Sequence, residues 1–281
     1  MGEECPTPGV SMLHYHRITI VLSPHPSYQC KSTRSGKAQQ NMTDLTKIKA
    51  LTFDVGGTVF DWRGGIEKEV SRLAAEQGAD VDVSQFATDW RRWMFVNLAR
   101  VRTGELSWRN ADRIHRNVLD DVLDKHTGLT LSASERDELN EVWHNLSAWH
   151  DAAEAINRLR SRYTTIVLTV LSYAIAVDCS KRNGIIWDGI LSCEFLGHYK
   201  TDPEAYQTAL ELLRVEPSEA IMVAAHERDL LAAQAIGIRT AYVHREGESD
   251  AFPGTSTLAA ATTQFDISAK DFPDLADKLL A

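Results

Sequence analysis

The hydrophobic positions of this 281-residue chain follow different periods in different stretches. Residues 47–60 start with an apolar, β-branched run that leads to a single carboxylate, Asp54, and then break at two glycines before Thr58. Such a run predicts a buried strand of a parallel sheet, and the glycine pair predicts a turn after it. Because ligands bind at the carboxyl ends of strands in open α/β sheets, Asp54 is a candidate site residue.

Between residues 63 and 149 the apolar positions recur three or four residues apart, which is the period of a helix. Four stripes show this spacing: Ile66, Val70 and Leu73; Phe86, Trp90, Trp93 and Met94; Ile114, Val118 and Val122; Leu139, Val142 and Leu146. A helical block of this size between the first and second strands is an insertion. We expect it to lie over the carboxyl end of the first strand as a cap.

After residue 150 the pattern alternates between helix and strand. Helices are expected at 151–160, 175–182, 202–213 and 228–236 and in a last segment ending at Leu280, and strands at 164–169, 189–193, 220–224, 240–243 and 265–267. This alternation predicts right-handed βαβ crossovers and a parallel sheet. The expected α/β fold is a Rossmann-like core, residues 47–62 and 150–281, with an α-helical cap, residues 63–149, inserted after the first strand.

Residues 1–46 show no sustained period and contain several prolines and a Ser/Lys/Gln-rich stretch. They predict a disordered N-terminal extension, and Met42 offers an alternative start. His14 and His16 lie in this tail without further ligands nearby, so we expect no metal site there. A mildly low-complexity stretch at 255–263 predicts a loop.

Charge and cysteine content exclude several classes of protein. A net charge of -9 argues against a surface for nucleic acid or anionic membranes. The four cysteines form neither a C-x-x-C pair nor a metal-ligand pattern, which favours reduced thiols. An apolar run of roughly 18 residues, as a membrane span requires, is absent from the sequence. We therefore expect a cytoplasmic protein that meets anionic substrates with a few local cations.

Three further polar residues follow later strands and could join Asp54 in one cleft: Thr169, Lys200 and Asp229. Asp54 can serve as a nucleophile, because the glycine turn exposes it and leaves backbone N–H groups free to hold an anion. A nearby ammonium would keep that nucleophile ionised by lowering its pKa. Each residue also has an ordinary alternative: a strand-end threonine, an exposed lysine and an acid at a helix N-terminus.

The order of these residues, together with the insertion after the first strand, resembles the haloacid dehalogenase superfamily over residues 47–245. Within it, the chain is most similar to the 2-haloacid dehalogenase type II group. The matching segments are 53–63, 89–91, 101–105, 187–191, 199–206 and 223–230.

Two departures from the wider superfamily bear on the chemistry. Phosphatase members carry a general acid two residues after the nucleophile and a Mg²⁺-binding acid four residues before the last aspartate. This chain has Gly56 and Ala225 at those positions. With one carboxylate left opposite Asp54, a hard cation lacks oxygen ligands. We expect neither a metal nor another cofactor, and no Mg²⁺-dependent phosphatase activity.

The resemblance implies a metal-independent hydrolytic dehalogenase that converts small 2-haloacids of the haloacetate type to 2-hydroxy acids. Asp54 would attack C2 of the substrate, expel halide and form an aspartyl ester that water then hydrolyses. Thr58 and Lys200 would position Asp54 and balance its charge. Asp229 would hold or activate the water with help from His226, which can accept a proton near pH 7.

The resemblance also implies three residues that contact the substrate. Thr169 would help to bind the substrate carboxylate, Arg91 would meet the departing halide and Tyr206 would line the site. Their alternatives are a structural threonine, a solvated cap cation like the nearby Arg92, and core packing. His226 could likewise simply cap the following helix.

Departures within the type II group keep other functions open. Val170, Ala224 and His226 stand where many members have Asn, Ser and Asn, and Gly56 replaces a bulky aromatic residue. The same Asp54 could therefore act on an epoxide or another electrophilic carbon in a biosynthetic pathway. A third alternative is a non-catalytic binding protein with this fold. The apolar cap stripes could serve a homodimer, which is common in the family, or the cap's own core.

Overall fold

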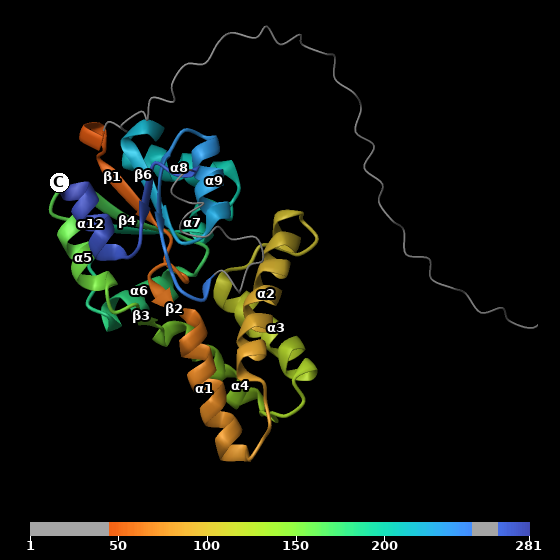
Figure 1. The fold of residues 1–281 in the computed structure, drawn as a ribbon. Helices are drawn as coiled ribbons and strands as arrows, with labels where there is room; N and C mark the ends of the chain where they lie inside the picture. Colours follow the sequence, from red (N-terminus) through yellow and green to blue (C-terminus); the bar gives the residue numbers. More distant parts are fainter. Residues whose placement is uncertain (1–44, 249–263) are drawn as a thin grey trace, which may run out of the picture. The chain divides into compact units, whose positions relative to one another are not determined.

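The computed structural model describes residues 45–248 and 264–281 (Figure 1). A short 3-10 turn, Leu45–Lys47, precedes the first strand. Most of the expected N-terminal extension and the loop expected at 255–263 lie outside the described residues.

A parallel sheet forms the centre of the described part of the chain. Its six strands lie in the order β5-β4-β1-β6-β7-β8, and every pairing is parallel. The strands are β1 (Ala50–Phe53), β4 (Thr164–Thr169), β5 (Gly189–Ser192), β6 (Ala220–Ala224), β7 (Arg239–Val243) and β8 (Ile267–Ala269). β1 lies between β4 and β6, so the carboxyl ends of these three strands meet at one edge. The predicted parallel α/β sheet is confirmed.

Helices cover both faces of this sheet (Figure 1). They are α5 (Ala152–Leu159), α6 (Tyr173–Arg182), α7 (Cys193–Leu196), α8 (Pro203–Leu213), α9 (Glu227–Ala235) and α12 (Phe272–Leu280). Alternate side chains of a strand point to opposite faces, and the two hydrophobic clusters follow this rule. Val223 packs in the cluster with α5, α6 and α12, whereas Met222 and Ala224 pack in the cluster with α8 and α9.

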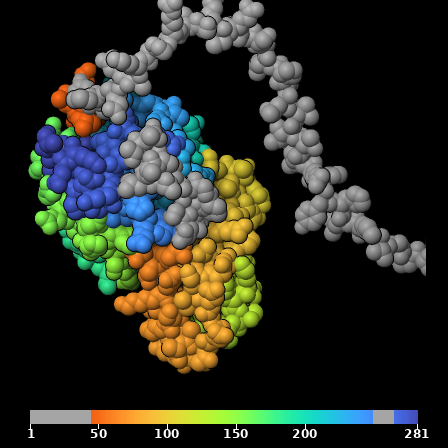
Figure 2. All heavy atoms as spheres, viewed as in Figure 1, coloured from red at the N-terminus to blue at the C-terminus, as the bar shows by residue number. Residues whose placement is uncertain are grey.

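Four helices and a 3-10 turn lie in the chain between residues 61 and 147. They are α1 (Trp62–Gln77), α2 (Val83–Arg102), α3 (Ala111–Lys125), α4 (Ala133–Asn140) and Glu141–Asn145. α2 packs against both α1 and α3, and its inward face buries Trp90 and Met94. Figure 2 shows the atoms of α1 and α2, in orange, at the lower end of the view. The predicted helical block is confirmed, while its treatment as a separate domain remains a prediction.

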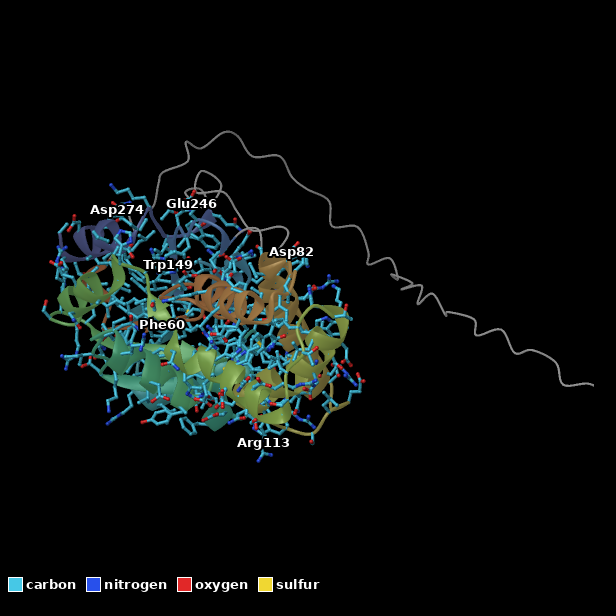
Figure 3. The ribbon with its side chains drawn as sticks, turned by 90° about the horizontal axis from the view of Figure 1, so that it is seen from below. Phe60, Asp82, Arg113, Trp149, Glu246 and Asp274 are labelled. Atoms are coloured by element: carbon cyan, nitrogen blue, oxygen red, sulfur yellow. The ribbon has the colours of Figure 1, made fainter. Side chains whose placement is uncertain are left out.

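A two-stranded antiparallel ribbon joins the two ends of this helical block. β2 (Phe60–Asp61) pairs with β3 (Ser147–Ala148). Strands of two residues are too short to show a period, so the sequence does not predict this pair. Trp149, labelled with Phe60 in Figure 3, continues the connection, because its backbone N–H donates to the Val59 carbonyl at 2.9 Å. Its indole N–H donates to the Gly57 carbonyl at 2.8 Å. The ribbon thereby fixes where the block leaves and re-enters the sheet domain.

Two further differences from the sequence-based expectation concern β8 and α7. β8 begins at Ile267, two residues later than predicted, because Asp266 meets β7 through its side chain, which accepts from the Thr240 amide at 2.9 Å. α7 was not expected, because four residues are too few to show a helical period. None of the described helices has the length and apolar character needed to cross a membrane. Cys179 and Cys193 are buried free thiols.

Candidate active site

Asp54 extends the backbone ladder of β1 by one residue and then turns its carboxylate into a buried site. Its amide donates to the Val223 carbonyl at 3.0 Å, and the residue is only 6% exposed. Gly57, with φ of 95°, reverses the chain after it. The reversal brings the Thr58 hydroxyl back to donate to Oδ2 of Asp54 at 2.7 Å. The predicted glycine turn thus positions Thr58 and leaves the Asp54 carboxylate facing the cavity.

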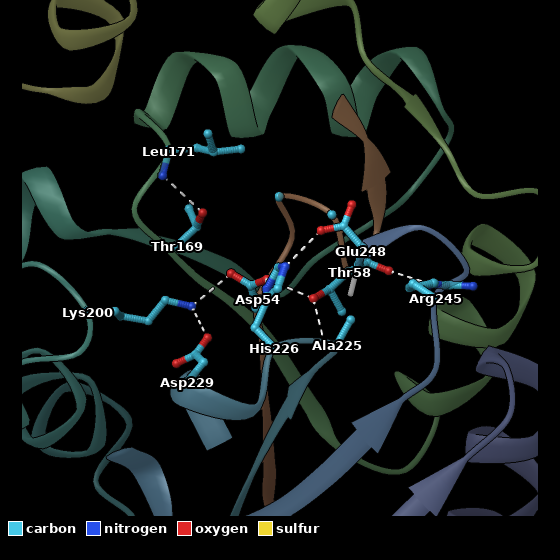
Figure 4. Close-up of polar contacts among 12 residues, drawn as sticks. Asp54, Thr58, Thr169, Leu171, Lys200, Ala225, His226, Asp229, Arg245 and Glu248 are labelled. Atoms are coloured by element: carbon cyan, nitrogen blue, oxygen red, sulfur yellow. Dashed lines mark hydrogen bonds and ion pairs between the residues drawn. The ribbon is translucent and has the colours of Figure 1, made fainter. Parts of the chain in front are cut away.

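Lys200 lies between two carboxylates (Figure 4). Its buried Nζ donates to Oδ1 of Asp54 at 2.9 Å and to Oδ2 of Asp229. Burial alone would raise the pKa of Asp54, but the charge of Lys200 and the hydrogen bond from His226 together hold that pKa well below its ordinary value. Burial lowers the pKa of Lys200, but the negative charges of the two aspartates outweigh this effect and raise the lysine pKa. Asp54 is therefore an ionised carboxylate paired with a buried cation at neutral pH.

Asp229, in the first turn of α9, uses both of its carboxylate oxygens. Lys200 donates to Oδ2, and the hydroxyl of the fully buried Tyr206 donates to Oδ1 at 2.5 Å. Burial raises the pKa of Asp229. The nearby negative charge of Asp54 raises it further, whereas the positive charge of Lys200 acts to lower it. Tyr206 thus acts on the site through Asp229.

His226 lies between two carboxylates as well. Its Nδ1 is 3.1 Å from Oδ2 of Asp54, and its Nε2 is 2.9 Å from Oε2 of Glu248. Burial lowers the imidazole pKa, but the two hydrogen bonds and the charges of Asp54 and Glu248 outweigh burial and raise it to about 9. Although His226 occupies the N-cap position of α9, its side chain makes no capping hydrogen bond. The site, rather than the helix end, accounts for its orientation.

Arg91 reaches the site from α2. The guanidinium lies over the rings of Trp62 and Phe95, with Cζ 5.3 and 4.9 Å from the ring centroids. Its Nη2 donates to the Gly56 carbonyl at 3.2 Å, whereas Nε and Nη1 are buried without a hydrogen-bond partner among the described residues. Burial lowers the pKa of Arg91, against the charges of Glu248 and Asp54. The side chain therefore brings unused N–H donors close to Asp54.

These groups line a cavity of about 420 Å³. Asp54, Arg91, Lys200, His226 and Asp229 contribute charged groups to its wall, and the remaining lining residues include Phe95, Leu98, Val170, Arg92, Arg102 and Arg228. A methyl group on Gly56 would lie 3.1 Å from Nη2 of Arg91, so the arginine occupies the space beside this glycine. The lining of the cavity thus combines charged groups with apolar side chains.

Thr169 and Tyr206 are not among the described residues that line this cavity. Thr169 ends β4 as predicted, and its hydroxyl accepts a hydrogen bond from the Leu171 amide at 3.1 Å. The structure therefore brings Asp54, Thr58, Lys200, His226 and Asp229 into one network, with Arg91 beside it and Tyr206 behind Asp229. The catalytic and substrate roles of all eight residues remain predictions.

Sequence reasoning missed two residues that follow β7. Glu248 is 4% exposed and contacts His226. Arg245 donates from Nε to the Thr58 carbonyl at 2.8 Å and pairs with Asp151 at 2.8 Å. One signal could have found them: the charged run 244–248 directly follows a predicted core strand, and such strands end at the same sheet edge.

Within residues 45–248 and 264–281, no group of three or more His, Cys, Asp and Glu side chains is placed to hold a metal ion. The two aspartates that face each other already share the Lys200 ammonium. The cation that the two carboxylates bind is thus the side chain of Lys200.

The sheet topology, the helical insertion and the network around Asp54 accompany a match to a family of hydrolases. The family model of the haloacid dehalogenase-like hydrolases matches residues 48–237. The chain belongs to this family.

Several 2-haloacid dehalogenases match this chain over most of their own length. The crystal structure of an L-2-haloacid dehalogenase is 32% identical with a TM-score of 0.76, and the match covers 83% of this chain and 99% of that one. A defluorinating L-2-haloacid dehalogenase is 33% identical with a TM-score of 0.73, over 83% and 96% of the two chains. The (S)-2-haloacid dehalogenase 4A of Burkholderia cepacia is 28% identical over 72% of this chain and 86% of that enzyme. The resemblance found in the sequence motifs is confirmed.

Proposed function

We propose that this protein is a hydrolytic dehalogenase that converts small 2-haloacids to 2-hydroxy acids through an ester on Asp54. The observation that carries this proposal is the buried Asp54 carboxylate, which Lys200 and Thr58 hold at the wall of the cavity. The names of the relatives, L-2-haloacid and (S)-2-haloacid dehalogenase, support the substrate class.

In the first step, one Asp54 oxygen attacks C2 of the haloacid in line with the carbon–halogen bond. The bond breaks, halide leaves with the electron pair, and C2 is inverted where it is chiral. A halide leaves without protonation, so the step needs no general acid at position 56. The Arg91 donors that have no hydrogen-bond partner among the described residues can stabilise the departing anion, because N–H groups already fixed in place need no reorganisation.

The substrate carboxylate would meet backbone amides of the turn after β1. Thr169 is fully buried and is not among the described residues that line the cavity, so a direct contact with the substrate would require a shift of the cavity wall. Its hydroxyl accepts from the Leu171 amide and keeps its own hydrogen available for such a contact. In the second step, water attacks Cγ of the Asp54 ester and regenerates the carboxylate. His226 contacts Asp54 directly at 3.1 Å, and Asp229 is linked to Asp54 through Lys200, so both could act on this water.

Halide release tests the proposal directly. Chloro-, bromo- and fluoroacetate and both enantiomers of 2-chloropropionate are assayed with EDTA present, for the parent protein, Asp54→Asn and the exposed control Asp121→Asn. We expect release that survives EDTA, vanishes in Asp54→Asn and persists in Asp121→Asn. A single turnover in H₂¹⁸O should label Asp54 rather than the product, because water attacks Cγ and not C2.

Absence of halide release from every haloacid, in a folded protein, would reject the proposal. The apolar Val170 in the cavity wall would then favour an epoxide or another electrophilic carbon as the target of Asp54. Ligand binding without turnover of either class would favour the non-catalytic alternative. A cytoplasmic location and a homodimer remain predictions, which cell fractionation and sedimentation equilibrium would test.

A further inference from the structure

Glu248, His226 and Asp54 form a continuous line of hydrogen bonds at the wall of the cavity (Figure 4). The Glu248 side chain is 5% exposed, so its interaction with the imidazole is shielded from solvent. The segment that carries it is anchored by Arg245, which binds the Thr58 carbonyl and Asp151. This arrangement places a fixed carboxylate behind a histidine that contacts the nucleophile.

Gly57 provides the space for Glu248. A Cβ atom built on this glycine would lie 2.4 Å from Oε2 of Glu248, the same oxygen that contacts His226. The turn after β1 thus serves two residues at once, since it also brings Thr58 to Asp54. The close approach ties the position of Glu248 to the backbone of the nucleophile's own turn.

Asp229 is poorly placed to accept a proton from water. Its two oxygens already accept from Lys200 and Tyr206. Its contact with Asp54 runs through the Lys200 ammonium, which is a donor only. His226, in contrast, presents Nδ1 directly to the carboxylate whose carbon is attacked.

We propose, given the dehalogenase function above, that His226 is the base of the ester-hydrolysis step and that Glu248 is the residue that positions it. Asp229 then serves to hold Lys200. In the free enzyme both ring nitrogens face carboxylate oxygens, which only accept hydrogen bonds, so the ring carries both protons. Ester formation removes the negative charge of Asp54, and the Nδ1 proton is released to solvent through the cavity. Glu248 accepts a hydrogen bond from Nε2 and so holds the remaining ring proton on that nitrogen, which leaves the Nδ1 lone pair facing the ester.

The hydrolysis step then balances as follows. Water adds its oxygen to Cγ of Asp54 and gives one proton to Nδ1 of His226. The tetrahedral oxyanion collapses, the bond between Cγ and the substrate oxygen breaks, and the alkoxide takes the proton from Nδ1 to become the 2-hydroxy acid. Asp54 is left as a carboxylic acid, which passes its proton to Nδ1 and restores the starting ion pair. Over both steps, one haloacid and one water yield one hydroxy acid, one halide and one proton.

The test compares Glu248→Gln with Glu246→Gln, which removes an exposed carboxylate two residues away. In rapid-quench assays we expect Glu248→Gln to release a burst of about one halide per site, at a rate within about threefold of the parent. Steady-state turnover should fall by about 10²–10⁴, the usual contribution of general acid–base catalysis. Mass spectrometry should then find the ester on the peptide that carries Asp54. Glu246→Gln should match the parent in both phases.

Two results would overturn the proposal: a Glu248→Gln turnover within about threefold of the parent, or an equal loss of burst and turnover. Should Glu248→Gln fail to fold by circular dichroism, His226→Gln decides by the same two criteria. When both single variants fold, the double variant should lose no more turnover than either one, because the residues act as a unit. Failure of the parent protein to release halide would instead reject the dehalogenase function itself.

Discussion

The Nζ of Lys200 lies 2.9 Å from Oδ1 of Asp54 and also donates to Asp229. One buried ammonium therefore serves two buried carboxylates. Removing it would leave two negative charges facing each other in a largely buried site, which a folded protein tolerates poorly. The ionisation of the nucleophile and the stability of the sheet edge consequently depend on the same side chain.

Lys200→Met should destabilise the protein by about 3–5 kcal/mol, as expected for a buried ion pair that loses one partner. Urea denaturation at pH 7 measures this change. Because Lys200 holds the pKa of Asp54 low, the variant should raise that pKa. The acid limb of the halide-burst rate should then move to higher pH. An unchanged limb in a folded variant would show that Lys200 does not control the ionisation of Asp54.

Arg91→Met should slow the halide burst by about 10²-fold or more, the range found when one transition-state donor is removed. Inhibition by added bromide should weaken at the same time, because the buried donors would no longer bind the product anion. Arg92 is the matched control, since it lines the same cavity but is exposed. Similar losses in Arg91→Met and Arg92→Met would indicate a general effect of positive charge rather than a halide site.

His226 should make folding stability depend on pH. Its pKa is raised from 6.5 to about 9 by Asp54 and Glu248 against the effect of burial. A raised folded-state pKa gives stability that is complete below about pH 6.5 and is lost as pH rises through 9. The contribution is at most on the order of 3 kcal/mol.

The measurement is the difference between the parent and His226→Gln in urea denaturation at pH 6 and at pH 9.5. The difference is needed because His144, beside Asp112 and Asp178, also has a pKa raised to about 9 and responds in the same window. The parent should lose more stability than His226→Gln between the two pH values. Equal losses would mean that His226 is not charged in the folded protein.

Gly57→Ala should both destabilise the protein and slow ester hydrolysis. The position has φ of 95°, and the added Cβ would collide with Glu248. Gly78→Ala is the control, because its φ of 62° is similarly positive but no atom of the described residues lies within 4 Å of the new Cβ. The control should lose about 1 kcal/mol from backbone strain alone. If Gly57→Ala keeps the halide burst but loses steady-state turnover, and Gly78→Ala keeps both, the effect is connected to Glu248.

The sequence by itself determined most of the fold. The strand at 164–169 and the strand at 220–224 have the predicted bounds, and the helical block lies between the first two core strands as expected. Site residues that a local pattern marks were predicted as well: Asp54 follows an apolar run, and Thr58 lies across a glycine turn four residues away. Such features depend on nearest neighbours along the chain, where period and turn chemistry are informative.

Tertiary structure decided how the site is wired. His226 contacts a residue 172 positions earlier and another 22 positions later, and no local pattern specifies either contact. The two-residue ribbon β2 and β3 and the turn role of the Thr169 hydroxyl were hidden for the same reason. The crossovers set which strand ends meet, and packing then sets which polar groups pair. A carboxylate such as Glu248 becomes part of the site only when the chain has folded around it.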